Sequence, residues 1–253
     1  MTDIFQIIDG TKEFHGVKAI KNVNFTLSKG EIHSLLGENG AGKSTMTKVA
    51  AGVYQLSSGS FIYEGKETTF LTPSEALKNG VVMVFQENSL VPNMTVSQNI
   101  YLGAENFFNS LAKLNIKASR FLQSLNFNVD PNLLVSQLGA AQKQMVEIAR
   151  AVHHNAKVII FDEPTATLTP EEKHHFFGLM QRLKKEGVSI VFISHALEEA
   201  LEHSDRITVL RDGELIETDT ARKFNRERIV KAMIGRDLTC LLYTSPSPRD
   251  TEV

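Results

Sequence analysis

The sequence has little cysteine and no surplus of positive charge. Its single cysteine, Cys240, cannot form a disulfide within the chain. The formal net charge of −2 argues against a nucleic-acid partner, because nucleic-acid-binding domains usually carry a basic surplus. No apolar run approaches the roughly 18 to 20 residues that span a bilayer, and the start of the chain lacks a signal-peptide pattern. We therefore expect any membrane role to come through a partner.

Short apolar runs alternate with helical patterns along the 253 residues, of which 42% are hydrophobic. Four of the runs predict buried parallel strands, each followed by a polar loop: Ile32–Leu36, residues 81–85, residues 158–161 and Ser189–Ile193. The alternation predicts an α/β fold, with helices on the faces of a parallel sheet. One helix is marked by a capping Thr169 and by Pro170, and it should end near Lys185.

Two regions depart from this alternation. Residues 88–152 show helix-like patterns at 96–102, 116–125 and 137–152 and no convincing strand, which predicts an inserted helical lobe. Alternating polar and apolar residues at 23–27, together with the run at 60–64, suggest a small antiparallel sheet beside the core. Residues 225–235 predict an amphipathic helix near the C-terminus.

The most specific motif is GENGAGKST, which fits the phosphate-loop pattern G-x-x-x-x-G-K-[ST] and lies between a predicted strand and a predicted helix. Glycines let successive backbone N–H groups point at one anion, and the helix N-terminus adds partial positive charge. Lys43 would reach the β- and γ-phosphates, and the Ser44 hydroxyl would bind Mg²⁺. The alternative is a structural glycine-rich turn. The predicted nucleotide-binding residues here are Gly37, Glu38, Asn39, Gly40, Ala41, Gly42, Lys43, Ser44 and Thr45.

Polar residues with matching chemistry follow the other three predicted strands, and ligands of such sheets lie beyond the carboxyl ends of strands. Asp162 would hold Mg²⁺ through water, and Glu163 would polarise the attacking water. Gln86 would contact a water bound to Mg²⁺, and His195 would donate to the γ-phosphate. Each residue taken alone is also consistent with a solvated turn or a helix cap.

Together these residues resemble the ATP-binding cassette (ABC) ATPases, over residues 5–238. The phosphate loop, Gln86, Asp162 with Glu163, and His195 correspond to the family's Walker A, Q-loop, Walker B with catalytic Glu, and H-loop. The resemblance implies a P-loop NTPase fold, with a RecA-like parallel core, a helical lobe and a small β lobe, and it implies ATP and Mg²⁺ as cofactors. It also implies that Phe14 stacks on adenine, where the family usually has Tyr; a core position is the alternative.

The sequence departs from the family in the loop that presses on a partner's γ-phosphate. Where most members have Leu-Ser-Gly-Gly-Gln, residues 138–142 are Leu-Gly-Ala-Ala-Gln. Losing one donor to transition-state charge costs about 3 kcal/mol, more than the roughly 0.3–1 kcal/mol that a helix dipole supplies. We expect the composite site completed by this loop to hydrolyse ATP poorly. Thr169 stands where the family's D-loop usually ends in Asp, which should weaken communication between sites.

Several segments resemble the first half of tandem sugar-importer ATPases of the ribose, galactose and xylose type, among them residues 92–103, 144–150 and 230–236. This resemblance implies transmembrane permease subunits, a second cassette and, indirectly, an extracytoplasmic sugar-binding protein as partners, with no nucleic acid. The expected location is the cytoplasmic face of the cell membrane. The alternatives are a soluble ABC-type ATPase of translation or DNA repair and a nucleotide-binding module that signals without turnover.

We divide the chain into a nucleotide-binding domain, residues 1–239, and a tail, residues 240–253. The tail has no periodicity and contains two prolines, Pro246 and Pro248. It resembles translated sequencing-adapter sequence, and a natural disordered tail is the alternative. We exclude it from the fold and expect the natural chain to continue past Leu238.

Overall fold

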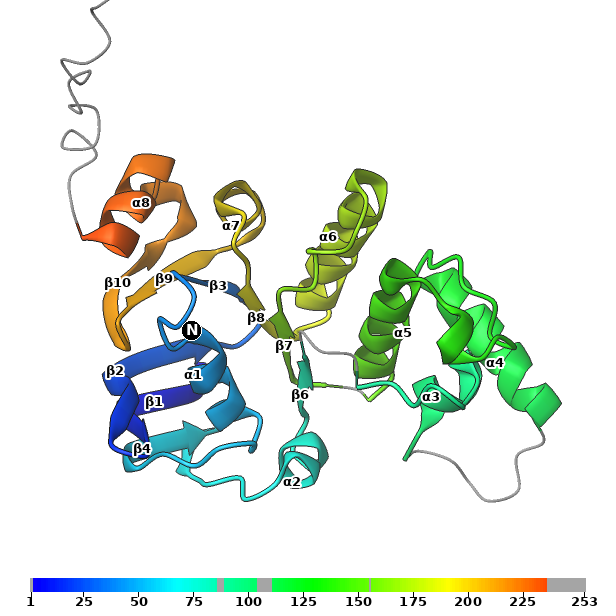
Figure 1. Cartoon of the computed structure of the whole chain (residues 1–253), viewed down its shortest axis with the longest axis horizontal. Coiled ribbons are helices and arrows are strands. Elements are labelled where there is room, and N and C mark those ends of the chain that lie inside the picture. Colours follow the sequence, from blue (N-terminus) through cyan, green and yellow to red (C-terminus); the bar gives the residue numbers. More distant parts are fainter. Residues whose placement is uncertain (1, 86–88, 104–110, 155, 236–253) are drawn as a thin grey trace, which may run out of the picture.

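Two β-sheets and a separate group of helices make up the computed structural model, which describes residues 2–85, 89–103, 111–154 and 156–235. One sheet has six strands in the order β10-β9-β3-β8-β7-β6, and the other has four in the order β2-β1-β4-β5. Figure 1 shows the helical group beyond the β6 edge of the larger sheet, with α8 at the β10 edge. No helix within the described ranges combines the length and the apolar composition needed to cross a membrane.

The larger sheet confirms the predicted parallel core. Its strands are β3 (Ile32–Leu36), β6 (Val81–Val84), β7 (Val158–Asp162), β8 (Ser189–Ile193), β9 (Arg206–Arg211) and β10 (Glu214–Thr220). All residues of β3, β7 and β8 are buried, as expected of strands covered on both faces. The strand β10 is antiparallel to β9, and every other pairing in the sheet is parallel.

The β9–β10 hairpin was not predicted, although the sequence carries its signal. Asp212 and Gly213 form its two-residue turn, and both have positive φ angles, 52° and 83°. Asp-Gly is a preferred sequence for this type of turn, because the backbone twist that it permits matches that of the flanking strands.

The smaller sheet is antiparallel, as predicted, and is more extensive than the sequence indicated. Its strands are β1 (Asp3–Phe14), β2 (Val17–Ser28), β4 (Ser58–Tyr63) and β5 (Lys66–Glu67). The strand β1 was missed because its pairing with β2 is interrupted by several register shifts. Such irregularities place neighbouring residues on the same face and remove the simple alternation that marks a strand.

Helices pack around the larger sheet: α1 (Lys43–Ala50), α2 (Pro73–Lys78), α6 (Pro170–Lys185), α7 (Leu197–His203) and α8 (Arg226–Ile234). The helices α1, α6 and α8 match predicted helical segments, whereas α7 was not predicted. The helix α6 begins and ends where predicted. Its first turn is closed by a capping box, in which the Glu172 amide donates to Thr169 Oγ1 (3.3 Å) and the Thr169 amide donates to Glu172 Oε2 (2.8 Å).

The helical lobe contains α3 (Val96–Tyr101), α4 (Leu111–Ser124), a 3-10 turn (Val135–Gln137) and α5 (Ala140–His153). The helices α3 and α4 fall within the segment predicted to be helical, residues 88–152, and α5 extends one residue beyond it; α4 begins before its own predicted range of 116–125. Leu114, Ala118 and Leu122 recur at helical spacing on the buried side of α4. Residues 89–103 and 111–154 contain no strand, only an isolated bridge between Thr95 and Leu134.

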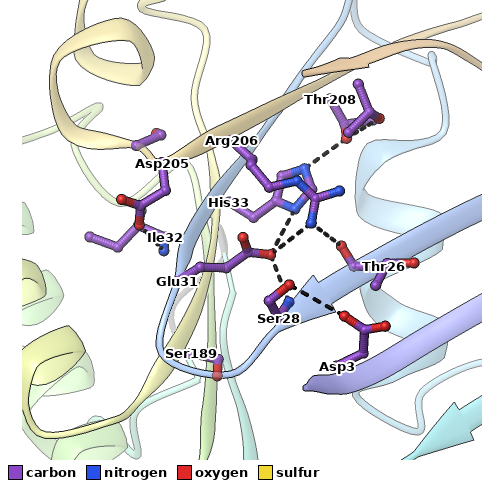
Figure 2. Close-up of polar contacts among 12 residues, drawn as sticks. Asp3, Thr26, Ser28, Glu31, Ile32, His33, Ser189, Asp205, Arg206 and Thr208 are labelled. Atoms are coloured by element: carbon purple, nitrogen blue, oxygen red, sulfur yellow. Dashed lines mark hydrogen bonds and ion pairs between the residues drawn. The ribbon is translucent and has the colours of Figure 1, made fainter. Parts of the chain in front are cut away.

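A buried polar cluster joins the two sheets at the start of β3 (Figure 2). The Ser28 amide, at the end of β2, donates to Glu31 Oε1 (2.7 Å), and Arg206 Nη1 donates to the same oxygen (3.2 Å). His33 Nε2 lies 2.7 Å from Thr208 Oγ1 on β9. Burial lowers the pKa of the fully buried His33, although the nearby Glu31 opposes this shift.

Candidate nucleotide site

The predicted phosphate loop connects β3 to α1, in the strand–loop–helix context that the motif requires. Gly42 immediately precedes α1 with a φ of 100°. A Cβ atom there would lie 2.6 Å from the carbonyl oxygen of Ala19 on β2. A Cβ on Gly37 would lie 2.3 Å from the carbonyl oxygen of Leu210 on β9. These two glycines therefore let the loop pass close to both sheets.

Lys43 is buried and folded back over this loop. Its Nζ donates to the carbonyl oxygens of Gly37 (2.7 Å) and Glu38 (3.0 Å). Burial lowers the pKa of Lys43, and the carboxylates of Glu163 and Asp162 oppose that shift. A phosphate oxygen would replace bonds to neutral carbonyls with a charge-assisted one, which is the stronger interaction.

Ser44 and Asp162 meet as predicted for a Mg²⁺ site. Ser44 Oγ donates to Asp162 Oδ1 across 3.4 Å. Burial raises the pKa of Asp162, and Glu163 raises it further, whereas Ser44, Lys48 and Lys43 lower it. The donors are hydroxyl and carboxylate oxygens, which are the ligands that Mg²⁺ prefers. The chemistry of this pair therefore fits the predicted metal.

Glu163 and His195 form a close pair at the carboxyl ends of β7 and β8. His195 Nε2 lies 2.5 Å from Glu163 Oε1, and the His195 side chain is the more exposed of the two. The backbone of Glu163 has a φ of 53°, which is uncommon for a residue other than glycine. Its amide donates to the carbonyl oxygen of Ile193 at the end of β8 (3.1 Å). Backbone conformation and neighbouring strand together direct this carboxylate toward His195.

A cavity of about 470 Å³ brings most of the predicted site together. It is lined by Phe14, Ala19, Asn39, Gly40, Ala41, Gly42, Lys43, Ser44, Thr45, Glu163 and His195. Phe14 is partly buried, and its ring packs edge-on against Tyr54 at 5.0 Å, with Lys12 Nζ 5.0 Å from the ring centre. Sequence reasoning missed Ala19 and Tyr54, which belong to no motif. Gln86 and residues 240–253 lie outside the described residues.

The altered loop at residues 138–142 lies in the helical lobe and contributes no residue to this cavity. Gly139 is the N-cap of α5, with φ and ψ of −69° and 167°, and it has no side chain to cap the helix. A Cβ atom on Gly139 would meet nothing within 4 Å. The position is therefore open to a serine side chain.

Comparison with known families finds that the model described as "ABC transporter" matches residues 20–166. Among curated proteins, the chain is 41% identical over 255 residues to a putative ribose/galactose/methyl galactoside import ATP-binding protein from Halalkalibacterium halodurans, covering 99% of the chain and 49% of the relative. It is 43% identical to a ribose import ATP-binding protein from Chelativorans sp., covering 97% and 49%. A xylose import ATP-binding protein from Thermoanaerobacter pseudethanolicus is also 43% identical, with 93% and 48% covered. The chain spans about half the length of these relatives.

The chain is also similar to solved structures of ATP-binding cassettes. A nucleotide-free ATP-binding cassette from an ABC transporter superposes with a TM-score of 0.78 at 26% identity, covering 97% of this chain and 100% of that one. A dimeric post-hydrolysis cassette bound to ADP and Pi superposes with a TM-score of 0.77 at 27% identity, covering 87% and 100%. The similarity therefore extends over both sheets and the helical lobe.

Proposed function

Because the chain belongs to the ABC transporter family, we propose that it binds ATP with Mg²⁺ and hydrolyses the nucleotide to power sugar import through a membrane permease. The observation that carries the proposal is the cavity in which a phosphate loop faces the Glu163–His195 pair. These groups come from three separate parts of the sequence. Their convergence is what hydrolysis of a bound triphosphate requires, since the phosphate must be held and the attacking water activated.

The residues divide this work by position. The loop amides and Lys43 would hold the β- and γ-phosphates, while Phe14 would stack on adenine. Ser44 and Asp162 would hold Mg²⁺, which when bound supplies positive charge beside the phosphates; Gln86 is proposed to assist there. Glu163 would accept hydrogen bonds from the attacking water and polarise it. His195, held against Glu163, would donate to the γ-phosphate.

An apolar groove offers a place for the permease. It has a volume of about 220 Å³ and lies between the edge strand β6 and the helices α2 and α5. Its lining includes Val81, Val82, Met83 and Val84 of β6, with Pro73 and Leu77 of α2 and Ala151 of α5. We propose that a short cytoplasmic helix of the permease occupies it, because the relatives are named as import proteins and this groove joins the sheet to the helical lobe. The chain would then sit at the cytoplasmic face of the membrane.

We further propose that two cassettes combine to form two unequal ATP sites. An extracytoplasmic binding protein would deliver the sugar to the permease. A solved relative is a cassette dimer, and the chain spans about half of its curated relatives. The site completed by residues 138–142 would be weak, because Gly139 offers no hydroxyl to the γ-phosphate of a partner. The Gly139→Ser variant in the full assembly should raise turnover at that site by up to about 100-fold. Unchanged turnover at both sites would contradict this inequality.

The central experiment compares wild type with Glu163→Gln in the full assembly of permease and both cassettes. We expect ATP hydrolysis at this chain's own site to fall about 100-fold or more, while Mg-ATP binding is retained. Sugar uptake into vesicles should fall with hydrolysis. Equal hydrolysis by the two proteins would overturn the proposal.

A nucleotide-dependent regulatory module is the second candidate, and the lack of a hydroxyl at Gly139 is the observation in its favour. It predicts nucleotide binding without turnover, so the same measurement separates the two. A soluble ATPase of translation or DNA repair is not favoured, because the curated relatives are named as sugar import proteins.

A further inference from the structure

Glu199, on α7, is a largely buried carboxylate that binds donors from three parts of the chain. Its Oε2 accepts hydrogen bonds from Thr165 Oγ1 (2.8 Å) and Ser194 Oγ (2.9 Å). Its Oε1 accepts from Lys173 Nζ on α6 (2.8 Å). Both oxygens are therefore committed, and the carboxylate connects the loop after β7, the loop after β8 and the helix α6.

The two hydroxyl partners stand next to the residues of the candidate site. Ser194 directly precedes His195, and Ser194 Oγ also accepts the amide N–H of Ala196, which directly follows His195 (3.0 Å). The backbone on both sides of His195 is thus tied, through Ser194, to Glu199. Thr165 lies two residues after Glu163 in the loop that carries that carboxylate. One side chain therefore holds the two loops whose side chains meet at 2.5 Å.

A general helix-stabilising role does not account for this arrangement. Glu198 and Glu199 both lie in the first turn of α7, where a negative charge interacts favourably with the helix dipole. The Glu198 side chain is 69% exposed and reaches Arg226 at 3.4 Å, whereas Glu199 is only 12% exposed. Burying a carboxylate is unfavourable unless its oxygens are satisfied, so the dipole alone would favour the exposed position. The burial of Glu199 is explained by the specific donors that it holds together.

We propose that Glu199 is a positioning residue for ATP hydrolysis. It holds the loops that contain Ser194 and Thr165, so that the side chains of His195 and Glu163 keep their contact. The inference rests on the proposed function, since it concerns that same site. Glu199 does not line the cavity, so its loss should affect turnover and leave nucleotide binding almost intact. A displacement of about 1 Å at a reacting group costs on the order of 100-fold in rate, which bounds the expected effect.

The test compares Glu199→Gln with the matched control Glu198→Gln, both in the full assembly. Glutamine keeps the shape and removes the charge that holds three donors at once. We expect kcat for ATP to fall roughly 10- to 100-fold in Glu199→Gln, with KM, the Kd for Mg-ATP and the binding stoichiometry within about twofold of wild type. The Glu198→Gln control should match wild type in every measurement. A merely structural role would instead lower kcat and binding stoichiometry together, because it reduces the folded fraction.

Single-link variants keep the proposal testable if Glu199→Gln does not fold. Thr165→Val and Ser194→Ala each remove one hydroxyl link and should each lower kcat several-fold, whereas Lys173→Met spares both links and should change kcat less than twofold. Wild-type kcat in Glu199→Gln, or in both hydroxyl variants, would overturn the inference. If Glu163→Gln also hydrolyses ATP like wild type, the proposed function itself fails; if Glu163→Gln alone is inactive, only the role of Glu199 is lost.

Discussion

The two ends of strand β3 both carry buried charge, and they differ in what surrounds it. Before the strand, Glu31 is surrounded by protein donors, and His33 and Arg206 complete a cluster between the sheets (Figure 2). After it, Lys43 and the nearby Asp162 lie beside the cavity described above, and the hydrogen bonds of Lys43 within the described part of the chain go to the neutral carbonyls of Gly37 and Glu38. Buried charges that protein groups satisfy hold the fold together, whereas those beside a cavity can be exchanged for ligand. Changes at the first end should alter stability, and changes at the second should alter binding.

The largest effect should come from Lys43→Ala, which removes the ammonium group beside the cavity. A hydrogen bond to a charged group contributes up to about 3 kcal/mol, so affinity for Mg-ATP should fall roughly 100-fold. Isothermal titration calorimetry measures this, with Lys157→Ala as the control, because Lys157 pairs with Glu64 on the surface. Equal affinity in Lys43→Ala and wild type would remove the basis of the nucleotide site.

At the opposite end, Glu31→Gln should lower the free energy of unfolding by about 2 kcal/mol, because the ion pair with Arg206 is lost in a largely buried setting. Urea unfolding measures the change. The Kd for Mg-ATP of the folded protein should remain at its wild-type value. A higher Kd for Mg-ATP without a loss of stability would show that the two ends of β3 are not separate in function.

Phe14→Ala should have a smaller effect, on binding alone. Stacking of a base on an aromatic ring contributes about 1–3 kcal/mol, and the low end of that range predicts about a fivefold loss of ATP affinity. Phe14→Tyr keeps the ring face and should bind within twofold of wild type. If both variants bind like wild type, adenine does not stack on this ring.

The smallest effect is a pH dependence of stability at the His33 end. Burial lowers the pKa of His33 in the folded state, so the unfolded chain takes up the proton first, near its ordinary value of about 6.5. The contribution of His33 is therefore complete above that pH and is lost as the pH falls below it, by at most about 1.4 kcal/mol per pH unit. The free energy of unfolding of His33→Asn should lack this pH dependence. The control His175→Asn, which replaces an exposed histidine, should keep it. A wild-type pH profile in His33→Asn would exclude the mechanism.

Much of the parallel core could be predicted because its signals are local. The strands β3, β7 and β8 are continuous apolar runs, and α6 carries a capping box within four residues. The strands β1, β9 and β10 were missed for different reasons. The pairing of β1 has register shifts that hide its period, whereas the Asp212–Gly213 turn of the β9–β10 hairpin was a readable signal that went unused.

The sequence by itself determined the residues proposed for the chemistry: a glycine-rich loop followed by Lys43 and Ser44, and acidic and imidazole groups just after apolar strands. Only the tertiary structure decided that β8 lies between β3 and β7, which brings Ser44 to Asp162 and Glu163 to His195. It also decided that Glu199 spans two loops and that Glu31 is enclosed by Ser28 and Arg206. The physical reason is that a local pattern records hydrophobicity and spacing along the chain. Distances between strand ends depend instead on strand order and register, which arise when the whole sheet packs.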